Sequence, residues 1–379
     1  AGLYMHIPFC RQRCGYCAFA VSDRHTGDEV FMRRYIEALF REYDVRLGKK
    51  EWAGTLFSTW YIGGGTPSQL GPGGVDQLFA EMNRRQALST FSEITFECNP
   101  EDLMLYPELP AQLYRLGVNR LSVGVQTTHL RGLQVLDRRC EVGDVYKSAD
   151  LLERDFKGSL SYDFMLGWPG QTVEDFVSGD LVFLKERHFD HLSIYFINYE
   201  PGTTLERDRR KGHFQPISED VEADLWDQLL PVMSDKGLEA YEISSFAAEG
   251  QRSIHNRNTW RGHPYLGLGC GAVSRAGRVR WTNLARAESY VAKLEDRRYP
   301  VAEAEYLTIK MQMQEKLMLS LRHIEGLARD DFREFHPFDP CEILGEKWFF
   351  WRDRGWLLEE GGRVRMSPEG WRRYDAILS

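Results

Sequence analysis

The sequence lacks the long apolar runs and the clustered charge that mark membrane proteins and nucleic-acid-binding proteins. No uninterrupted apolar stretch approaches the roughly 20 residues that cross a bilayer, and the first residues show no charged segment followed by an apolar signal core. The 48 basic residues are scattered among 56 acidic ones, with a net charge of −8 and no Lys or Arg run that would neutralise phosphates. We therefore expect a cytoplasmic protein with no transmembrane segment and no nucleic-acid partner.

Cysteine is also scarce, with seven residues in 379, and three of them fall close together near the N-terminus. An odd count, together with the missing secretion signal, disfavours a disulfide framework and favours metal or cluster ligation. The rest of the composition, 42% hydrophobic and 27% charged residues, is that of an ordinary globular protein. At this length we expect one large domain and a smaller one.

Six apolar runs rich in β-branched and aromatic residues recur along the first half of the chain, and each is followed by a stretch with helical spacing. This alternation predicts an α/β fold in which parallel strands form a partial (β/α)6 barrel of the TIM type, with its chemistry at the C-terminal ends of the strands. The predicted strands span residues 3–8, 56–63, 93–98, 120–126, 159–166 and 191–199.

The regular alternation stops near residue 240, and this change predicts the domain boundaries. Residues 1–240 would form the barrel, residues 241–300 an irregular connecting segment, and residues 301–379 a smaller C-terminal α+β domain. Apolar spacing predicts one long helix from residue 302 to about residue 322. The tail after it is typical of two helices and a hairpin, which is the pattern of a small winged helix.

The first predicted strand runs into Cys10, Cys14 and Cys17, a C-x3-C-x2-C spacing on one loop. Three thiolates on a short loop can bind three irons of a [4Fe–4S] cubane and leave the fourth iron open for an amine and a carboxylate. The alternatives are chance clustering and a zinc site, although zinc usually takes four ligands and no second cysteine pair is present. A loop of this spacing directly after a first strand resembles the radical S-adenosylmethionine (SAM) superfamily.

Further motifs, in order along nearly the whole chain, resemble the HemN/HemW branch of that superfamily. Each belongs to a strand end, where close backbone approach and buried polar groups call for a ligand or a partner. The motifs are LYMHIPFC at residues 3–10, GGGTPS at 63–68, FECNP at 96–100, GVNRLSVGVQ at 117–126, GWPGQT at 167–172 and YEIS at 241–244.

The resemblance implies a role for individual residues in binding SAM. The amine would meet Gly64, Gly65 and Thr66, the carboxylate Arg138 and Tyr4, the methionine and ribose groups Glu97 and Gln126, the ribose Asp163, and adenine Tyr16. The alternative for the strand-end residues Glu97, Gln126 and Asp163 is that they are helix caps or ion pairs. The alternative for the two tyrosines is ordinary packing.

Phe19 distinguishes the two sides of the branch, because the HemN dehydrogenases carry a further Cys at this position. Phe19 in place of that Cys favours the HemW side. HemW members are heme chaperones with an HNxxYW motif associated with heme. Here that stretch reads His255 to Trp260, with Thr259 in place of Tyr. The resemblance implies His255 as a heme ligand and Trp260 as an apolar face for the porphyrin, since a neutral imidazole suits heme iron. A structural hydrogen-bonding role is the alternative for His255.

We therefore expect a SAM-binding [4Fe–4S] heme chaperone that binds heme or porphyrin, takes electrons from a donor and passes heme to an acceptor protein. The alternatives are radical SAM enzymes, either a class C-like methyltransferase or a coproporphyrinogen III oxidase-like decarboxylase. Phe19 disfavours the decarboxylase, whereas Thr259, and Val273 at a position where the family has His, leave the methyltransferase open. Cys270 would be a buried packing residue or, alternatively, a heme thiolate.

Overall fold

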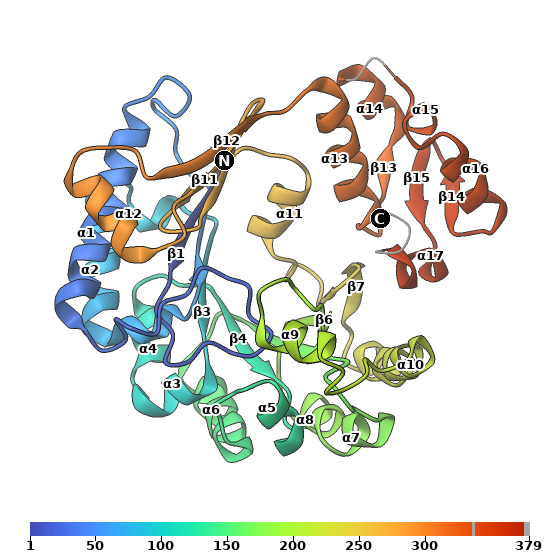
Figure 1. The fold of residues 1–379 in the computed structure, drawn as a ribbon, viewed down its shortest axis with the longest axis horizontal. Coiled ribbons are helices and arrows are strands. Elements are labelled where there is room, and N and C mark those ends of the chain that lie inside the picture. Colours follow the sequence, from blue (N-terminus) through green and yellow to red (C-terminus); the bar gives the residue numbers. More distant parts are fainter. Residues whose placement is uncertain (336–337, 375–379) are drawn as a thin grey trace.

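Six parallel strands form the centre of a twelve-stranded sheet in the computed structural model, which describes residues 1–335 and 338–374. Helices between the strands cover the outside of the sheet (Figure 1), and the arrangement confirms the predicted partial α/β barrel. The strands are β1 (Gly2–Ile7), β2 (Thr59–Gly64), β3 (Glu93–Cys98), β4 (Arg120–Gln126), β5 (Ser159–Leu166) and β6 (His191–Phe196). The helices are α1 (Glu29–Leu47), α2 (Gly71–Asn83), α3 (Pro100–Leu105), α4 (Leu109–Arg115), α5 (Leu130–Val135), α6 (Val142–Asp155), α7 (Val173–Ser178), α8 (Asp180–Glu186), α9 (Thr204–Arg210) and α10 (Glu219–Asp235).

Alternation along each strand decides which side chains reach the barrel interior. In β1, Leu3, Met5 and Ile7 are fully buried members of the main hydrophobic core. Successive side chains of a strand point to opposite faces, so Tyr4 and His6 face the other side, toward the interior. Helix α1 begins at the Asp28 cap, whose carboxylate accepts from the Phe31 amide. The same period of two in β2 to β6 lines the interior with polar groups.

The segment expected to be irregular, residues 241–300, is regular in the structure. It adds strands at both edges of the sheet, because short strands separated by glycine turns pair with β6 on one side and with β1 on the other. These elements are β7 (Glu239–Glu242), β8 (Ser245–Ala247), α11 (Ile254–Trp260), β9 (Tyr265–Leu268), β10 (Val273–Ala276), β11 (Val279–Asn283) and α12 (Ala287–Glu295).

The predicted long helix from residue 302 is also partly wrong. Its first part is strand β12 (Val301–Tyr306), which pairs antiparallel with β11 and places Glu305 opposite Arg280. Helix α13 (Ile309–Leu321) begins only after Thr308, whose hydroxyl accepts from the Met311 amide.

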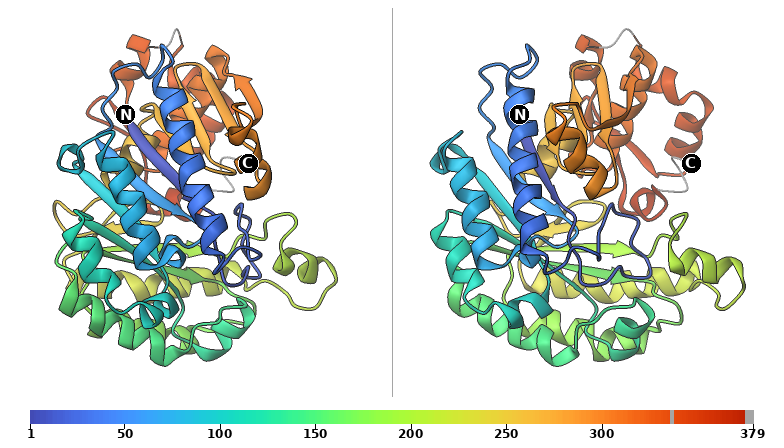
Figure 2. Two further views of the ribbon diagram at one scale, coloured as in Figure 1. Left: turned by 90° about the vertical axis from the view of Figure 1, so that its left-hand side faces the viewer. Right: turned by 60° about the vertical axis from the view of Figure 1, so that its left-hand side comes forward.

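A small C-terminal unit beside the barrel has its own hydrophobic core and a three-stranded sheet in the order β13-β15-β14 (Figures 1 and 2). Residues 336–337 and 375–379 of the predicted C-terminal domain lie outside the described residues. Among the described residues, no helix is both long and apolar enough to cross a membrane. The elements of the unit, in addition to α13, are β13 (Leu327–Ala328), α14 (Arg329–Phe335), α15 (Pro340–Leu344), α16 (Glu346–Asp353), β14 (Leu357–Glu360), β15 (Arg363–Met366) and α17 (Pro368–Arg372).

Candidate cluster and cofactor site

A cavity of about 600 Å³ opens at the C-terminal ends of the parallel strands. Parallel strands end at the same edge of the sheet, so the residues that follow them meet there although they are far apart in sequence. All but three of the predicted site residues line this cavity: Cys10, Cys14, Cys17, Tyr16, Gly64, Gly65, Thr66, Glu97, Gln126, Arg138 and Asp163.

The loop that carries the three cysteines is fastened to the barrel at both ends. His6, near the end of β1, donates from Nε2 to the Ala20 carbonyl oxygen over 2.8 Å, and its Nδ1 lies 3.0 Å from the Tyr4 hydroxyl. Burial lowers the pKa of His6 to about 4, so the neutral ring can donate at one nitrogen and accept at the other. Thr26 donates to the Cys10 carbonyl oxygen over 2.7 Å. The loop is therefore held independently of any bound group.

The cysteine set fits a cluster better than a single metal ion. Among the described residues, no three His, Cys, Asp or Glu side chains converge on a position for one ion. In a cubane, by contrast, each thiolate binds its own iron and the sulfur atoms stay apart. Burial raises the pKa of Cys10 to about 12 and also raises that of Cys17. Iron binding at these thiols would therefore release protons.

The glycine run after β2 is required by close packing. A Cβ atom on Gly63 would lie 2.7 Å from the Glu97 carboxyl carbon, and one on Gly65 would lie 2.7 Å from the Pro8 carbonyl carbon. A Cβ atom on Gly64 would overlap the His6 ring, and Gly64 has a φ of +116°, which favours glycine. The run thus exposes bare backbone to the cavity.

Two partly buried carboxyl groups project from β3 and β5 into the cavity. Glu97 accepts from the Tyr61 hydroxyl over 2.7 Å and from the Gly64 amide over 3.0 Å, and burial raises its pKa to about 7. Asp163 accepts from the Ser122 hydroxyl over 2.8 Å through Oδ2, whereas its buried Oδ1 has no partner among the described residues. Burial raises the pKa of Asp163 as well. Asp163 therefore retains an acceptor for a ligand hydroxyl.

Arg138 lies between the cysteine loop and β4. Its Nη2 donates to the Gly124 carbonyl oxygen over 2.8 Å and lies 3.4 Å from Glu101 Oε2, and its Nη1 lies 3.8 Å from Cys14 Sγ. The guanidinium is buried, and its Nε has no partner among the described residues. A buried cation here can pair with a ligand carboxylate while holding the loop.

Gln126 ends β4 in a conformation that few residues adopt. Its φ is +69°, and the pairing of β4 with β5 shifts register between Gly124 and Gln126. A bulge of this kind turns a side chain away from the regular alternation. The neighbouring Asn99 donates to Thr66 Oγ1 over 3.0 Å, so Thr66 is positioned by β3 as well as by its own loop.

The two tyrosines differ in position. Tyr16 lines the cavity and is partly buried, and the loss of water around its hydroxyl raises its pKa well above the usual value. Tyr4 is not among the lining residues, and its hydroxyl contacts His6. Tyr4 thus supports the ring that fastens the cysteine loop.

His255 and Trp260, on α11, face different neighbours. His255 is 6% exposed at the N-terminal ends of the strands, where its Nδ1 lies 2.9 Å from the Thr59 hydroxyl. Burial lowers the pKa of His255 to about 4, so its ring is neutral. Trp260 packs against the C-terminal unit, with the Arg322 guanidinium 4.9 Å from its ring centre and the His323 ring edge-on at 5.3 Å. Neither residue lines the cavity beside the cysteines.

The cysteines outside the loop are packed or peripheral. Cys270 is fully buried, its Sγ accepts from the Tyr35 hydroxyl over 3.4 Å, and its amide donates to the same oxygen over 2.9 Å. Cys98 and Cys140 are buried and Cys341 is partly exposed, all with free thiols. This environment favours the packing interpretation of Cys270.

Sequence reasoning did not single out Tyr61, Ser122 or Asn99, which hold three of the predicted ligand residues. All three carry short polar contacts at the cavity: Tyr61 to Glu97, Ser122 to Asp163 and Asn99 to Thr66. Strand alternation could have found Tyr61, since it shares a face of β2 with Gly63.

Comparison with known proteins gives the chain a place among radical SAM proteins. The sequence profile of the radical SAM superfamily matches residues 4–178. The heme chaperone HemW of Lactococcus lactis is 30% identical over 97% of this chain and 93% of that protein, and the HemW of Bacillus subtilis is 31% identical over 87% and 86%. Radical S-adenosyl methionine domain-containing protein 1, mitochondrial, of Bos taurus is 30% identical over 100% and 86%.

A solved structure shares the fold along the whole chain. Coproporphyrinogen III oxidase (HemN) of Escherichia coli superimposes with a TM-score of 0.81 at 18% identity, covering 100% of this chain and 88% of that one. At this identity the likeness extends to the fold alone.

Proposed function

Because the chain belongs to the radical SAM superfamily and, within it, to the HemW family, we propose that it is a heme chaperone that carries a [4Fe–4S] cluster and SAM. The cluster and SAM part of the proposal rests on one observation: three loop cysteines and eight other predicted residues line the same cavity. The heme part rests on the HemW relatives, which match the chain over nearly its whole length.

Cys10, Cys14 and Cys17 would hold the cluster, which when reduced supplies the electron that splits a sulfonium bond. The glycine backbone and Thr66 would bind the methionine amine. The other roles are Arg138 for the carboxylate, Glu97 and Gln126 for the methionine and ribose groups, Asp163 for the ribose and Tyr16 beside adenine. Tyr4 would act through His6 or, as the family suggests, on the carboxylate.

The free Oδ1 of Asp163 and the free Nε of Arg138 support this assignment. Each is a buried polar atom at the cavity wall, where a hydrogen bond to a ligand contributes most. An electron donor for the cluster and an acceptor protein for heme complete the proposed set of partners.

The cluster is tested by anaerobic reconstitution of the parent protein and of Cys14→Ala, followed by iron content and visible absorbance. Loss of the cluster absorbance is expected, because one of the three iron ligands is removed. Cys140→Ala is the matched control, as its thiol lies outside the loop. Full iron content in Cys14→Ala would contradict the assignment.

Heme binding is tested by titrating the cluster-loaded protein with hemin and following the Soret band. If His255 is the ligand, its Nε2 can bind iron while Nδ1 keeps the Thr59 contact, and His255→Ala should alter the band while the cluster stays intact. His188→Ala, at a side chain 75% exposed, is the control. An unchanged band in His255→Ala would move the ligand elsewhere, with His323 next, because its buried Nε2 has no partner among the described residues and lies beside Trp260.

The chaperone proposal as a whole fails if the parent protein binds no heme. Formation of a methylated product from SAM and hemin would favour the methyltransferase instead.

A further inference from the structure

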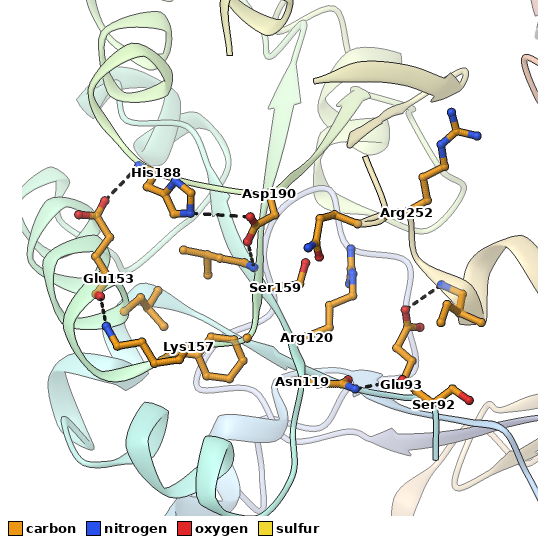
Figure 3. Close-up of a pocket in the computed structure, with 17 residues that line it drawn as sticks. Ser92, Glu93, Asn119, Arg120, Glu153, Lys157, Ser159, His188, Asp190 and Arg252 are labelled. Carbon is orange, nitrogen blue, oxygen red and sulfur yellow. Dashed lines mark hydrogen bonds and ion pairs between the residues drawn. The ribbon is translucent and has the colours of Figure 1, made fainter. Parts of the chain in front are cut away.

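A second cavity, of about 760 Å³, lies at the opposite ends of the strands from the cysteines (Figure 3). It is bordered by the first residues of β3, β4 and β5 and by residues 250–254, which lead from β8 into α11. None of the predicted cluster or SAM residues lines it. Cavities of this size accommodate small-molecule ligands.

Arg120, the first residue of β4, brings a buried guanidinium to this cavity, and although burial opposes its charge, the nearby Glu93 carboxylate raises its pKa. It is 3% exposed, and its Nη2 donates to His191 Nδ1 over 3.2 Å, while its Nε and Nη1 have no partner among the described residues. The Ser161 hydroxyl also lies within hydrogen-bond distance of His191 Nδ1, at 2.8 Å. Burial and the nearby Arg120 lower the pKa of His191, so this ring is neutral and does not offset the charge.

Ser159 stands directly opposite Arg120. The two residues are register partners in the pairing of β4 with β5, and parallel partners present their side chains to the same face. The buried Ser159 hydroxyl also has no partner among the described residues. Figure 3 shows the two side chains next to each other at the centre of the cavity.

The carboxylates around this cavity already accept backbone hydrogen bonds. Glu93 accepts from the Ile254 amide over 2.7 Å and from the next amide over 2.8 Å. Asp190 accepts from the Leu160 amide over 2.9 Å, and Glu153 accepts from the His188 amide over 3.1 Å. The buried side-chain donors that remain unpartnered among the described residues of this wall are those of Arg120 and Ser159.

We propose that this cavity is a second binding site, for a small molecule that carries a carboxylate or phosphate group. The oxyanion of the ligand pairs with the Arg120 guanidinium and accepts from the Ser159 hydroxyl. Charge-assisted hydrogen bonds of this kind are strong, and here they would satisfy the two guanidinium nitrogens of Arg120 that have no hydrogen-bond partner among the described residues. Lys157 and Arg252, drawn at either side of the cavity in Figure 3, also line it, and the Arg252 guanidinium already pairs with Glu325 over 3.4 Å.

The test is a calorimetric titration of the cluster-loaded protein with inorganic phosphate and, separately, with succinate, at constant ionic strength in chloride. Both titrations are done with and without saturating SAM, because Arg120 also borders the cavity beside the cysteines. We expect saturable binding of at least one anion, unaffected by SAM. Tighter binding of phosphate identifies a phosphate ligand, and tighter binding of succinate identifies a carboxylate.

Two variants of the wall should weaken this binding. Arg120→Gln removes the charge and should weaken it about tenfold or more, and Ser159→Ala removes one hydrogen bond and should weaken it by about threefold to tenfold. Arg84→Gln removes the same charge from an exposed position directly after α2 and should leave binding unchanged. If Arg120→Gln does not fold, the anion affinity of Ser159→Ala alone decides whether the proposal holds.

Three results would overturn the proposal. The first is no saturable binding of either anion. The second is equal binding by the parent, Arg120→Gln and Ser159→Ala, which means an adventitious ion only. The third is anion binding that SAM abolishes, which means that the anion occupies the cavity beside the cysteines.

Discussion

At the scale of the residue, the cavity beside the cysteines is built from polar groups that the barrel holds in a buried state. Glu97 shows what this costs. Its carboxyl group accepts two hydrogen bonds, but burial outweighs them and raises its pKa from 4.5 to about 7. The same burial makes each remaining donor or acceptor a strong ligand contact.

The raised pKa of Glu97 predicts a pH dependence of stability. Between about pH 4.5 and pH 7 the folded protein keeps a proton that the unfolded chain releases, so its stability should fall as pH rises through this window. The contribution is at most about 3 kcal/mol. Glu97→Gln should flatten this slope in denaturant unfolding of the cluster-loaded protein. Glu174→Gln, on the exposed side of α7, is the control, and an unchanged slope in Glu97→Gln would contradict the prediction.

Gly64 predicts a second effect at single-residue scale. Gly64→Ala places a Cβ atom on the His6 ring at a φ of +116°, which should cost about 1–3 kcal/mol of stability and weaken SAM binding. Gly73→Ala is the matched control, since its Cβ meets no atom within 4 Å and helix α2 favours Ala by about 0.5–1 kcal/mol. Denaturant unfolding and SAM titration measure both variants. Equal losses in the two variants would rule out the packing argument.

At the scale of the element, the sequence predicted the parts with strong local signals. The six central strands were found because each is an apolar run followed by a helical stretch, and β3, β4 and β5 match residue for residue. Strand β12 was missed because its Ala and Glu residues favour helices and are depleted in strands, which outweighed the alternation within Val301–Tyr306. Its pairing with β11, including Arg280 with Glu305, depends on contacts that no local window contains.

The predicted site residues also divide into those that local sequence order could place and those that it could not. Those at the cavity follow strands, so parallel order alone gathers them. His255 could not be placed in this way, because α11 follows an antiparallel strand and returns to the other end of the barrel. Arg120 belongs to one of the sequence motifs, but only the folded structure shows that two of its guanidinium nitrogens have no hydrogen-bond partner among the described residues.

At the scale of the whole molecule, the barrel and the C-terminal unit have separate hydrophobic cores joined by a polar seam. Arg322 lies at the centre of this seam. It donates to Glu242, which is 1% exposed, over 2.7 and 3.1 Å, and its guanidinium covers the Trp260 ring. Nearby, Glu325 pairs with Arg261 over 3.0 Å. Two cores that meet through a few ion pairs can unfold in two steps.

Arg322→Gln should therefore loosen the C-terminal unit from the barrel without altering the cluster. The change leaves the Glu242 carboxylate buried and without its cation, which should cost about 2–3 kcal/mol, because hydrogen bonds to charged groups contribute that much. Calorimetry should show an earlier first transition, and limited proteolysis should cut sooner between β12 and α13. Arg365→Gln removes an ion pair to Glu360, which is 66% exposed, from the hairpin of the same unit, and should shift neither measurement appreciably. If Arg322→Gln and Arg365→Gln behave alike, the seam does not depend on the pair with Glu242, and docking of the unit must come instead from the backbone hydrogen bonds of Ile243 and Ile324 and from the apolar contacts around Ile243.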